Sequence, residues 1–146
     1  MPESRDDMDE KHRVLSQVFG YREFRGGQET LIDAQLAGRD AFGVMPTGGG
    51  KSLCYEIPAL LLEGAALVVC PLISLMKDQV AALTAAGVPA AYINSSLTPE
   101  QIRTVYRYML AGRYKIVYVA PERLLTEGFL RTVDGMRISL VAVDEA

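Results

Sequence analysis

The chain has 146 residues, of which 49% are hydrophobic and 23% are charged, and its formal net charge is −3. This composition predicts one soluble globular domain with its own core. The acidic balance offers no electrostatic sign of a nucleic-acid binder, although helix N-termini and backbone amides also hold phosphates. The sequence has no secretory signal pattern and no uninterrupted apolar stretch of about 20 residues. We therefore expect a cytoplasmic protein with no membrane segment.

Helical and strand patterns alternate after residues 1–10, which are charged, lack apolar periodicity and are predicted to be a disordered acidic leader. Apolar residues then recur at helical spacing or stand in short runs typical of buried strands. The expected elements are helices at 12–19 and 28–37, a strand at 41–45, a helix at 51–62, a strand at 66–70, a helix at 73–86, a strand at 90–94, a helix at 99–110, a strand at 115–120, a short helix at 122–125 and a strand at 139–146. This alternation predicts an α/β fold, a mostly parallel sheet with helices on both faces.

The helix expected over 99–110 has the clearest start signal. Thr98 can cap the helix, Pro99 suits its first turn, and Gln101 completes a capping box. The two cysteines, Cys54 and Cys70, lack metal-type spacing and are predicted to be buried thiols in a reducing compartment.

A glycine-rich loop stands between a predicted strand and a predicted helix. It consists of Thr47, Gly48, Gly49, Gly50, Lys51 and Ser52. Glycines let backbone N–H groups turn inward without a Cβ, and the helix that follows aims its positive dipole end at the same point. Lys51 can reach the β- and γ-phosphates of a nucleotide, and the Ser52 hydroxyl can ligate Mg²⁺. The strict pattern has a glycine where this chain has Met45, and the alternative is a flexible turn before an ordinary helix.

An acidic pair, Asp144 and Glu145, ends the last predicted strand. Ligand sites of a parallel sheet lie beyond the carboxyl ends of its strands, so we expect this pair and the glycine loop to share one edge. Asp144 can then hold Mg²⁺ through water, and Glu145 can polarise an attacking water. The alternative is a strand that runs into a polar turn.

Five segments resemble, in order and approximate spacing, those of the RecQ DNA helicases of helicase superfamily 2. They are YREFRGGQETLI, VMPTGGGKSLCY, VVCPLISLMKDQV, YVAPERLL and LVAVDEA, and the resemblance covers nearly all of the chain from Val14 to Ala146. It implies a RecA-like P-loop NTPase lobe of an ATP-dependent helicase that unwinds DNA in the 3′ to 5′ direction during replication, recombination and repair. The implied cofactors are ATP and Mg²⁺, and the implied partner is single-stranded or duplex DNA, in the nucleoid of a bacterium or the nucleus of a eukaryote.

The resemblance also implies roles for single residues of the adenine-recognition segment YREFRGGQ. Tyr21 and Arg25 would pack around the base, and Gln28 would hydrogen-bond its edge. An amide offers a donor and an acceptor side by side, and a guanidinium plane can stack on a base. The alternatives are a packing aromatic for Tyr21 and an exposed first-turn residue for Gln28. Gly26 stands where the family commonly has proline.

Two further segments resemble the DNA-facing motifs Ia and Ib of the family. In the first, Ser74 and local amides would contact the phosphates of single-stranded DNA, with Lys77 nearby. The second would contribute Pro121, Glu122 and Arg123. The alternative is that the apolar residues Leu72, Ile73, Leu75 and Met76 are simply core and that Lys77 is a solvated charge.

The chain ends within the family's DEAH box, since a histidine would follow Ala146. The resemblance therefore predicts that residues 11–146 are a truncated first RecA-like lobe. A strand that normally separates the glycine-loop strand from the acidic strand, and a second lobe with an arginine finger, would follow. For the 146-residue chain, the alternative is a nucleotide-binding module or an inactive truncation without turnover. An unrelated P-loop kinase lacks counterparts to the adenine and DNA-facing segments.

Overall fold

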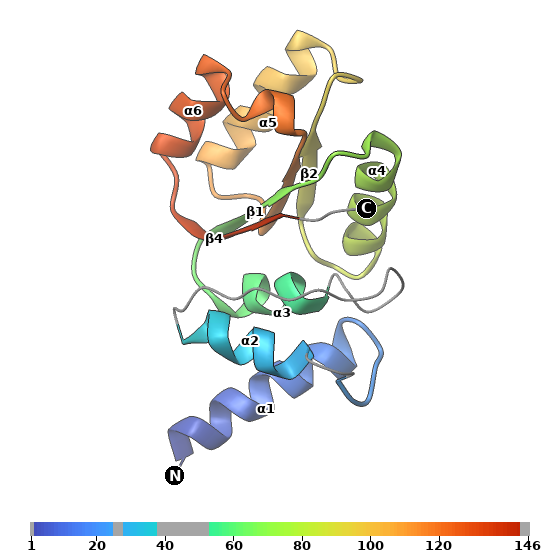
Figure 1. Cartoon of the computed structure of the whole chain (residues 1–146), viewed down its shortest axis with the longest axis vertical. Coiled ribbons are helices and arrows are strands. Elements are labelled where there is room, and N and C mark those ends of the chain that lie inside the picture. Colours follow the sequence, from blue (N-terminus) through green and yellow to red (C-terminus); the bar gives the residue numbers. More distant parts are fainter. Residues whose placement is uncertain (1, 25–27, 38–52, 144–146) are drawn as a thin grey trace. The chain divides into compact units, whose positions relative to one another are not determined.

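The computed structural model describes residues 2–24, 28–37 and 53–143, and the chain forms two compact units, Met1–Leu62 and Glu63–Ala146 (Figure 1). The first unit contains helices, and the second contains a sheet with its covering helices. Within the described residues, no helix is long and apolar enough to cross a membrane. The strand expected at 41–45 lies outside these residues.

The first unit has three described helices: α1 (Pro2–Gln17), α2 (Gln28–Leu36) and α3 (Leu53–Leu61). Their shared core contains four buried residues, Leu15, Ile32, Leu53 and Ile57. Leu53 and Ile57 are four residues apart, so they lie on one face of α3. Helices α2 and α3 therefore form where their apolar spacing predicted them.

Helix α1 begins at Pro2 and therefore includes most of residues 1–10, which were expected to be a disordered leader. The expectation rested on the absence of an apolar stripe in residues 1–10. A polar sequence has no such stripe whether or not it is helical, so periodicity cannot detect this kind of helix.

Helix α3 contains Pro58, which has no N–H to donate to the carbonyl of Cys54, four residues earlier. The side-chain amide of Gln35, on α2, donates to that carbonyl at 2.7 Å. A helix-breaking proline is thus tolerated because a neighbouring helix satisfies the carbonyl that it leaves without its helical partner.

The second unit contains four strands: β1 (Ala65–Val69), β2 (Ala90–Ile93), β3 (Ile116–Val119) and β4 (Ile138–Val143). They form one sheet in the order β2-β3-β1-β4, and every neighbouring pair is parallel. Figure 1 shows α4 (Ile73–Ala85) on one side of the sheet, with α5 (Pro99–Leu110) and α6 (Glu127–Asp134) on the other. The predicted α/β fold with a parallel sheet is confirmed.

The central strands β1 and β3 are almost entirely buried, and all four residues of β3 are inaccessible. One face of the sheet packs on α5 and α6 through a cluster that includes Leu67, Ile93, Ile102, Val117 and Phe129. Strands that are buried on both faces need continuous apolar runs, which is the pattern that the sequence has at these positions.

The start of α5 agrees with the predicted capping box. Thr98 Oγ1 accepts from Gln101 N at 3.1 Å, and Gln101 Oε1 accepts from Thr98 N at 2.9 Å. Two other elements differ from expectation. The short helix near 122–125 is a 3₁₀ turn, η1 (Pro121–Arg123), and α6 was not predicted at all.

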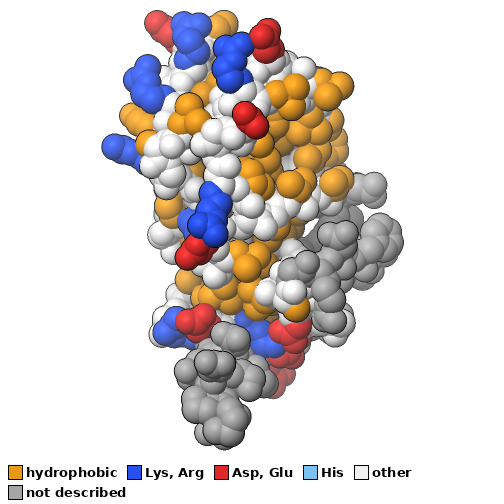
Figure 2. Space-filling model, turned by 90° about the vertical axis from the view of Figure 1, so that its left-hand side faces the viewer, with side chains coloured by type: hydrophobic (Ala, Val, Ile, Leu, Met, Phe, Trp, Pro, Cys, Tyr) orange, Lys and Arg blue, Asp and Glu red, His pale blue; other side chains and the backbone are white. Residues whose placement is uncertain are grey.

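Strand β4 lies at one edge of the described sheet, where it pairs with β1 alone. Its Val141 and Val143 are 64% and 71% exposed, although both are strongly apolar. Figure 2 shows that hydrophobic side chains also gather in one continuous area of the surface, beside a group of Lys and Arg side chains. An exposed apolar strand at a sheet edge is a site where a further strand can pair.

Gly64 precedes β1 and can be tested directly. Its φ is +99°, and a Cβ on it would lie 2.6 Å from the backbone oxygen of Arg137. Gly87 is a matched control, because its φ is +86° and nothing lies within 4 Å of a Cβ there. We expect Gly87→Ala to lower the free energy of unfolding by about 1–2 kcal/mol, from backbone strain alone. Gly64→Ala should cost about 1–3 kcal/mol more, because it adds a steric clash. Urea unfolding measures both losses, and equal losses would contradict the close approach.

Candidate functional site

The carboxyl ends of the strands define one edge of the second unit, because all four strands run parallel. The segment after β1 leads into α4, the segment after β2 leads into α5, and the segment after β3 forms η1. Strand β4 ends at Val143, and Asp144 is the next residue in the sequence. Crossover connections in parallel sheets bring such segments together at one edge, where ligands bind.

The segment after β1 exposes its predicted DNA-facing residues. Ser74 lies in the first turn of α4, Lys77 lies one turn later, and both side chains are exposed. Leu72 and Ile73 are exposed as well, so the alternative that the apolar residues of this segment are simply core holds for Met76 but not for these two. Leu72 provides no side-chain cap to the helix, so the first-turn amides are not satisfied by a capping side chain at that position.

The 3₁₀ turn η1 holds the second predicted DNA-facing segment. Pro121 and Glu122 are exposed, whereas Arg123 is half-buried. The Nε atom of Arg123 is buried and has no hydrogen-bond partner among the described residues. Buried donors without an acceptor are rare in proteins, so Arg123 Nε is an unusual feature of this turn.

The turn after β2 is organised by Asn94, a residue that sequence reasoning missed. Asn94 is inaccessible, and its Oδ1 accepts from Ser96 N at 2.8 Å and from Ser96 Oγ at 2.5 Å. Its Nδ2 lies 3.4 Å from the sulfur of Met76, on α4. One buried amide therefore joins the turn after β2 to the helix after β1. The available signal was an asparagine placed directly between a strand and two serines.

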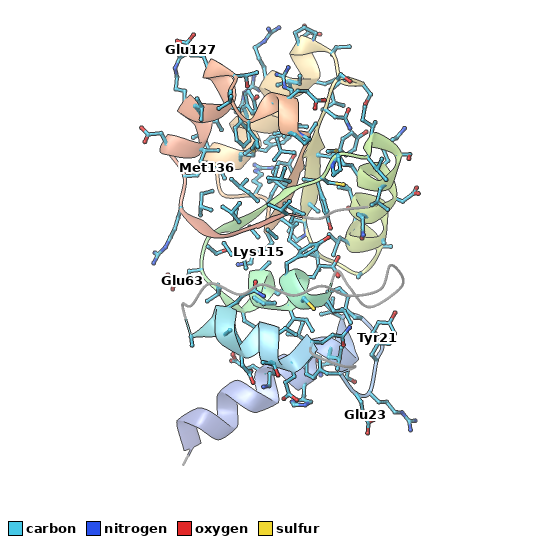
Figure 3. The ribbon with its side chains drawn as sticks, viewed as in Figure 1. Tyr21, Glu23, Glu63, Lys115, Glu127 and Met136 are labelled. Atoms are coloured by element: carbon cyan, nitrogen blue, oxygen red, sulfur yellow. The ribbon has the colours of Figure 1, made fainter. Side chains whose placement is uncertain are left out.

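The adenine-recognition segment belongs to the first unit. Gln28 is the first residue of α2 and is only 3% exposed, so it is not the exposed residue of the alternative interpretation. Tyr21 is 42% exposed, and it lies with Glu23 on the loop after α1 (Figure 3). Its backbone N–H donates to the carbonyl of Leu15 at 3.1 Å, which holds the start of this loop against α1. Arg25 lies outside the described residues.

The predicted phosphate loop and acidic pair also lie outside the described residues. These positions are Thr47, Gly48, Gly49, Gly50, Lys51, Ser52, Asp144 and Glu145. In the part of the chain that the structure describes, no group of three His, Cys, Asp or Glu side chains could hold a metal ion. Cys70 is buried as predicted, whereas Cys54 is half-buried, and burial raises the pKa of the Cys54 thiol.

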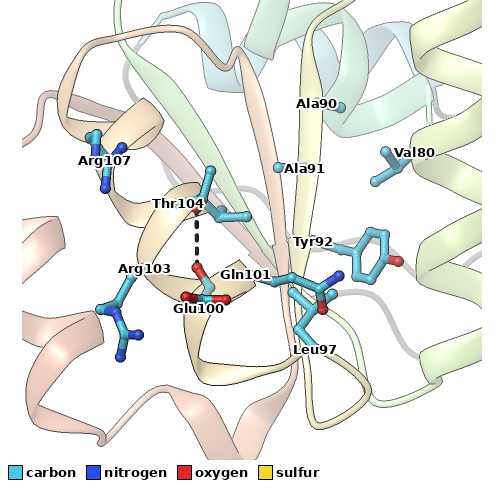
Figure 4. A pocket seen from close by; sticks show the side chains of 11 residues that line it. Val80, Ala90, Ala91, Tyr92, Leu97, Glu100, Gln101, Arg103, Thr104 and Arg107 are labelled. Atoms are coloured by element: carbon cyan, nitrogen blue, oxygen red, sulfur yellow. Dashed lines mark hydrogen bonds between the residues drawn. The ribbon is translucent and has the colours of Figure 1, made fainter.

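A pocket of about 670 Å³ opens at the outer edge of β2, between α4 and α5 (Figure 4). None of the predicted site residues lines it. Two of its polar side chains already bond to backbone groups. Gln101 Oε1 accepts from the Thr98 N–H at the start of α5, and Thr104 Oγ1 donates to the carbonyl of Glu100. Nucleotide and metal sites instead need several polar groups that converge on the ligand.

Residues 25–146 match the DEAD/DEAH box helicase family, and the chain belongs to this family. The fold agrees, because helicase domains of this family are RecA-like and this chain has their parallel sheet with flanking helices.

Among curated relatives, the chain is similar to helicases of the RecQ type. It is 51% identical over 133 residues to the ATP-dependent DNA helicase RecQ of Pasteurella multocida. This match covers 91% of this chain and 21% of that protein. Identity is 48% to the RecQ helicase of Bacillus subtilis, over 91% of this chain and 23% of the relative. The chain is 42% identical to the ATP-dependent DNA helicase Q1 of Rattus norvegicus, and this match covers 92% of this chain and 23% of that protein. The chain thus spans about a fifth of the length of these relatives.

Replacing Asn94 tests whether it organises the turn at the carboxyl edge. Asn94→Ala removes a buried side chain and leaves the Ser96 amide without its acceptor, so we expect the free energy of unfolding to fall by about 1–3 kcal/mol. The Ser96 amide should also exchange its hydrogen faster. Ser95→Ala is the control, because Ser95 is exposed on the same turn. If Asn94→Ala behaves like Ser95→Ala in both measurements, Asn94 does not hold the turn.

Proposed function

We propose that this chain is the ATP-binding part of the first motor lobe of a RecQ-type DNA helicase, which moves along single-stranded DNA in the 3′ to 5′ direction. The observation that carries the proposal is the parallel order of the four strands, which brings the two predicted DNA-facing segments to one edge of the sheet. The relatives named RecQ, at 48–51% identity, support the type of helicase.

Phosphate binding is assigned to the glycine-rich loop. Amides of the loop from Thr47 to Gly50 cradle the triphosphate, and Lys51 neutralises charge on its β- and γ-phosphates. Ser52 and Asp144 supply a hydroxyl and a carboxylate, and oxygen donors of this kind fit Mg²⁺. When bound, Mg²⁺ supplies charge neutralisation for the transferred phosphoryl group.

Hydrolysis and base recognition are assigned to separate groups. Glu145 orients and polarises the water that attacks the γ-phosphate in line. Gln28 reads the edge of adenine, and Tyr21 and Arg25 pack around the base. The exposure of the Tyr21 ring supports this role, and the burial of Gln28 is consistent with a side chain that is held in one orientation.

DNA binding is assigned to the start of α4 and to η1. Ser74 and Lys77 are exposed at the start of one helix, where the helix dipole and first-turn amides favour phosphate. Pro121 and Glu122 are exposed on the neighbouring turn, and half-buried Arg123 adds a positive charge to that turn, which favours a phosphate nearby. These local features allow DNA binding although the net charge of the chain is negative.

The phosphate role of Lys51 is tested in the full-length protein. We expect Lys51→Ala to abolish Mg-ATP binding or DNA-stimulated ATP hydrolysis, because no other predicted loop side chain carries a positive charge to the triphosphate. Arg131→Ala is the control, since Arg131 is exposed on α6 and pairs with exposed Glu127, at 2.8 Å. Undiminished DNA-stimulated ATPase in Lys51→Ala would falsify the assignment.

The DNA role of Lys77 predicts a change in salt dependence. Loss of one phosphate contact should reduce the slope of log K against log salt concentration by about 0.7 for single-stranded DNA. We expect this change in Lys77→Ala and no change in Arg131→Ala, with affinities measured by fluorescence anisotropy. An unchanged slope in Lys77→Ala would show that Lys77 is only a solvated charge.

A further inference from the structure

One buried ammonium group joins α1 to α2. Lys11, on α1, is 3% exposed, and its Nζ lies 2.8 Å from Oε2 of Glu29 and 2.5 Å from Oδ1 of Asp33. Glu29 and Asp33 are four residues apart on α2, so they lie one above the other on the same helix face. A single lysine thus spans the first turn and a half of α2.

The charge of Lys11 is held in place by these two carboxylates. Burial alone would lower the pKa of the ammonium group, but the hydrogen bonds and charges of Asp33 and Glu29 outweigh it, so the pKa of Lys11 is raised. A buried ammonium needs such partners, and its bonds to carboxylates are stronger than bonds between neutral groups. The contact therefore fixes α2 relative to α1 more tightly than apolar packing alone.

The same helix also anchors the segment that leads into α2. The Tyr21 N–H bonds to the carbonyl of Leu15, and the ring of His12 meets Phe24 edge-on at 5.2 Å between centroids. At the other end of this segment, Gln28 directly precedes Glu29, one of the two partners of Lys11. Both ends of the segment that carries Tyr21 and Gln28 are therefore tied to α1.

We propose that Lys11 is a positioning residue for base recognition: it holds the first turn of α2 so that Gln28 keeps one orientation toward adenine. This inference rests on the proposed role of Gln28 in reading the base. A hydrogen-bond reader discriminates between bases only if its donor and acceptor are held within a few tenths of an ångström of the correct geometry. Triphosphate binding does not depend on this orientation.

The test compares three ligands in the full-length protein: ATP, GTP and inorganic triphosphate, each with Mg²⁺. Lys11→Met keeps the length of the side chain and removes its charge. We expect its affinity for ATP to fall about tenfold, the equivalent of one hydrogen bond of about 1.4 kcal/mol, while its affinities for GTP and triphosphate stay unchanged. Lys11→Arg should retain the preference for ATP, because it keeps the charge.

Two controls separate this role from general stability. Arg13→Met removes a cation from the same helix, but Arg13 is exposed and lies 4.0 Å from exposed Glu10, so it should leave all three affinities unchanged. Asp33→Asn weakens the same cluster at a half-exposed position away from Gln28, and it should also reduce the preference for ATP. This second variant gives the answer if Lys11→Met does not fold.

The outcomes distinguish this inference from the proposed function. If the wild-type protein prefers ATP and both cluster variants keep that preference, the positioning role is overturned and the proposed function stands. Equal losses for ATP and triphosphate also overturn it, because they indicate a structural role only. If the wild-type protein binds no ATP, the proposed function itself fails, and the inference fails with it.

Discussion

The parallel pairing of β1 with both β3 and β4 is the constraint on which the second unit depends. Because these pairs are parallel, each strand must return through a crossover helix, and every turn into such a helix falls at the same edge. The central position of β1 requires an apolar run that can be buried on both faces, which AALVV provides. The edge at which Ser74, Lys77 and η1 gather is thus a consequence of strand direction and not of any single side chain.

Polar contacts decide the finer geometry in both units. Asn94 joins a turn to α4, Gln35 satisfies the carbonyl that Pro58 leaves without its helical donor, and Lys11 ties α1 to α2. Each group is wholly or partly removed from water, so leaving its partner unsatisfied costs more than a surface contact contributes. Such contacts hold one arrangement among the several that apolar packing alone would allow.

Much of the fold could be predicted because its signals are local. Continuous apolar runs marked β1 and β3, and the Thr98 capping box marked the start of α5. Helix α6 was missed, although Thr126 precedes it and Phe129 and Val133 lie on one face, because eight residues give little periodicity to detect. Helix α1 was missed in its first ten residues for the opposite reason, since a polar helix carries no apolar pattern.

The candidate site was predicted less completely than the fold. The apolar type of Leu72 and Ile73 suggested burial, yet both are exposed, and the burial of Lys11 depends on partners in another helix. Lys11 is 18 and 22 residues from its two carboxylates, and no local rule links an ammonium to acids at that separation. Spacing of Glu29 and Asp33 on one face of α2 was the only available hint.

If the carboxyl ends of the parallel strands face a bound metal–triphosphate, as we propose, a paramagnetic metal ion at that site broadens the NMR signals of those ends. When Mn²⁺ replaces Mg²⁺ beside a non-hydrolysable ATP analogue, it weakens the NMR signal of an amide more strongly the closer that amide lies to the metal. Strands β1 and β4 have five and six residues, so their two ends lie about 15–20 Å apart. We expect strong loss of the Cys70 and Val143 signals and little loss at Ala65 and Ile138. Stronger loss at Ala65 and Ile138, or equal loss at both ends, would contradict it.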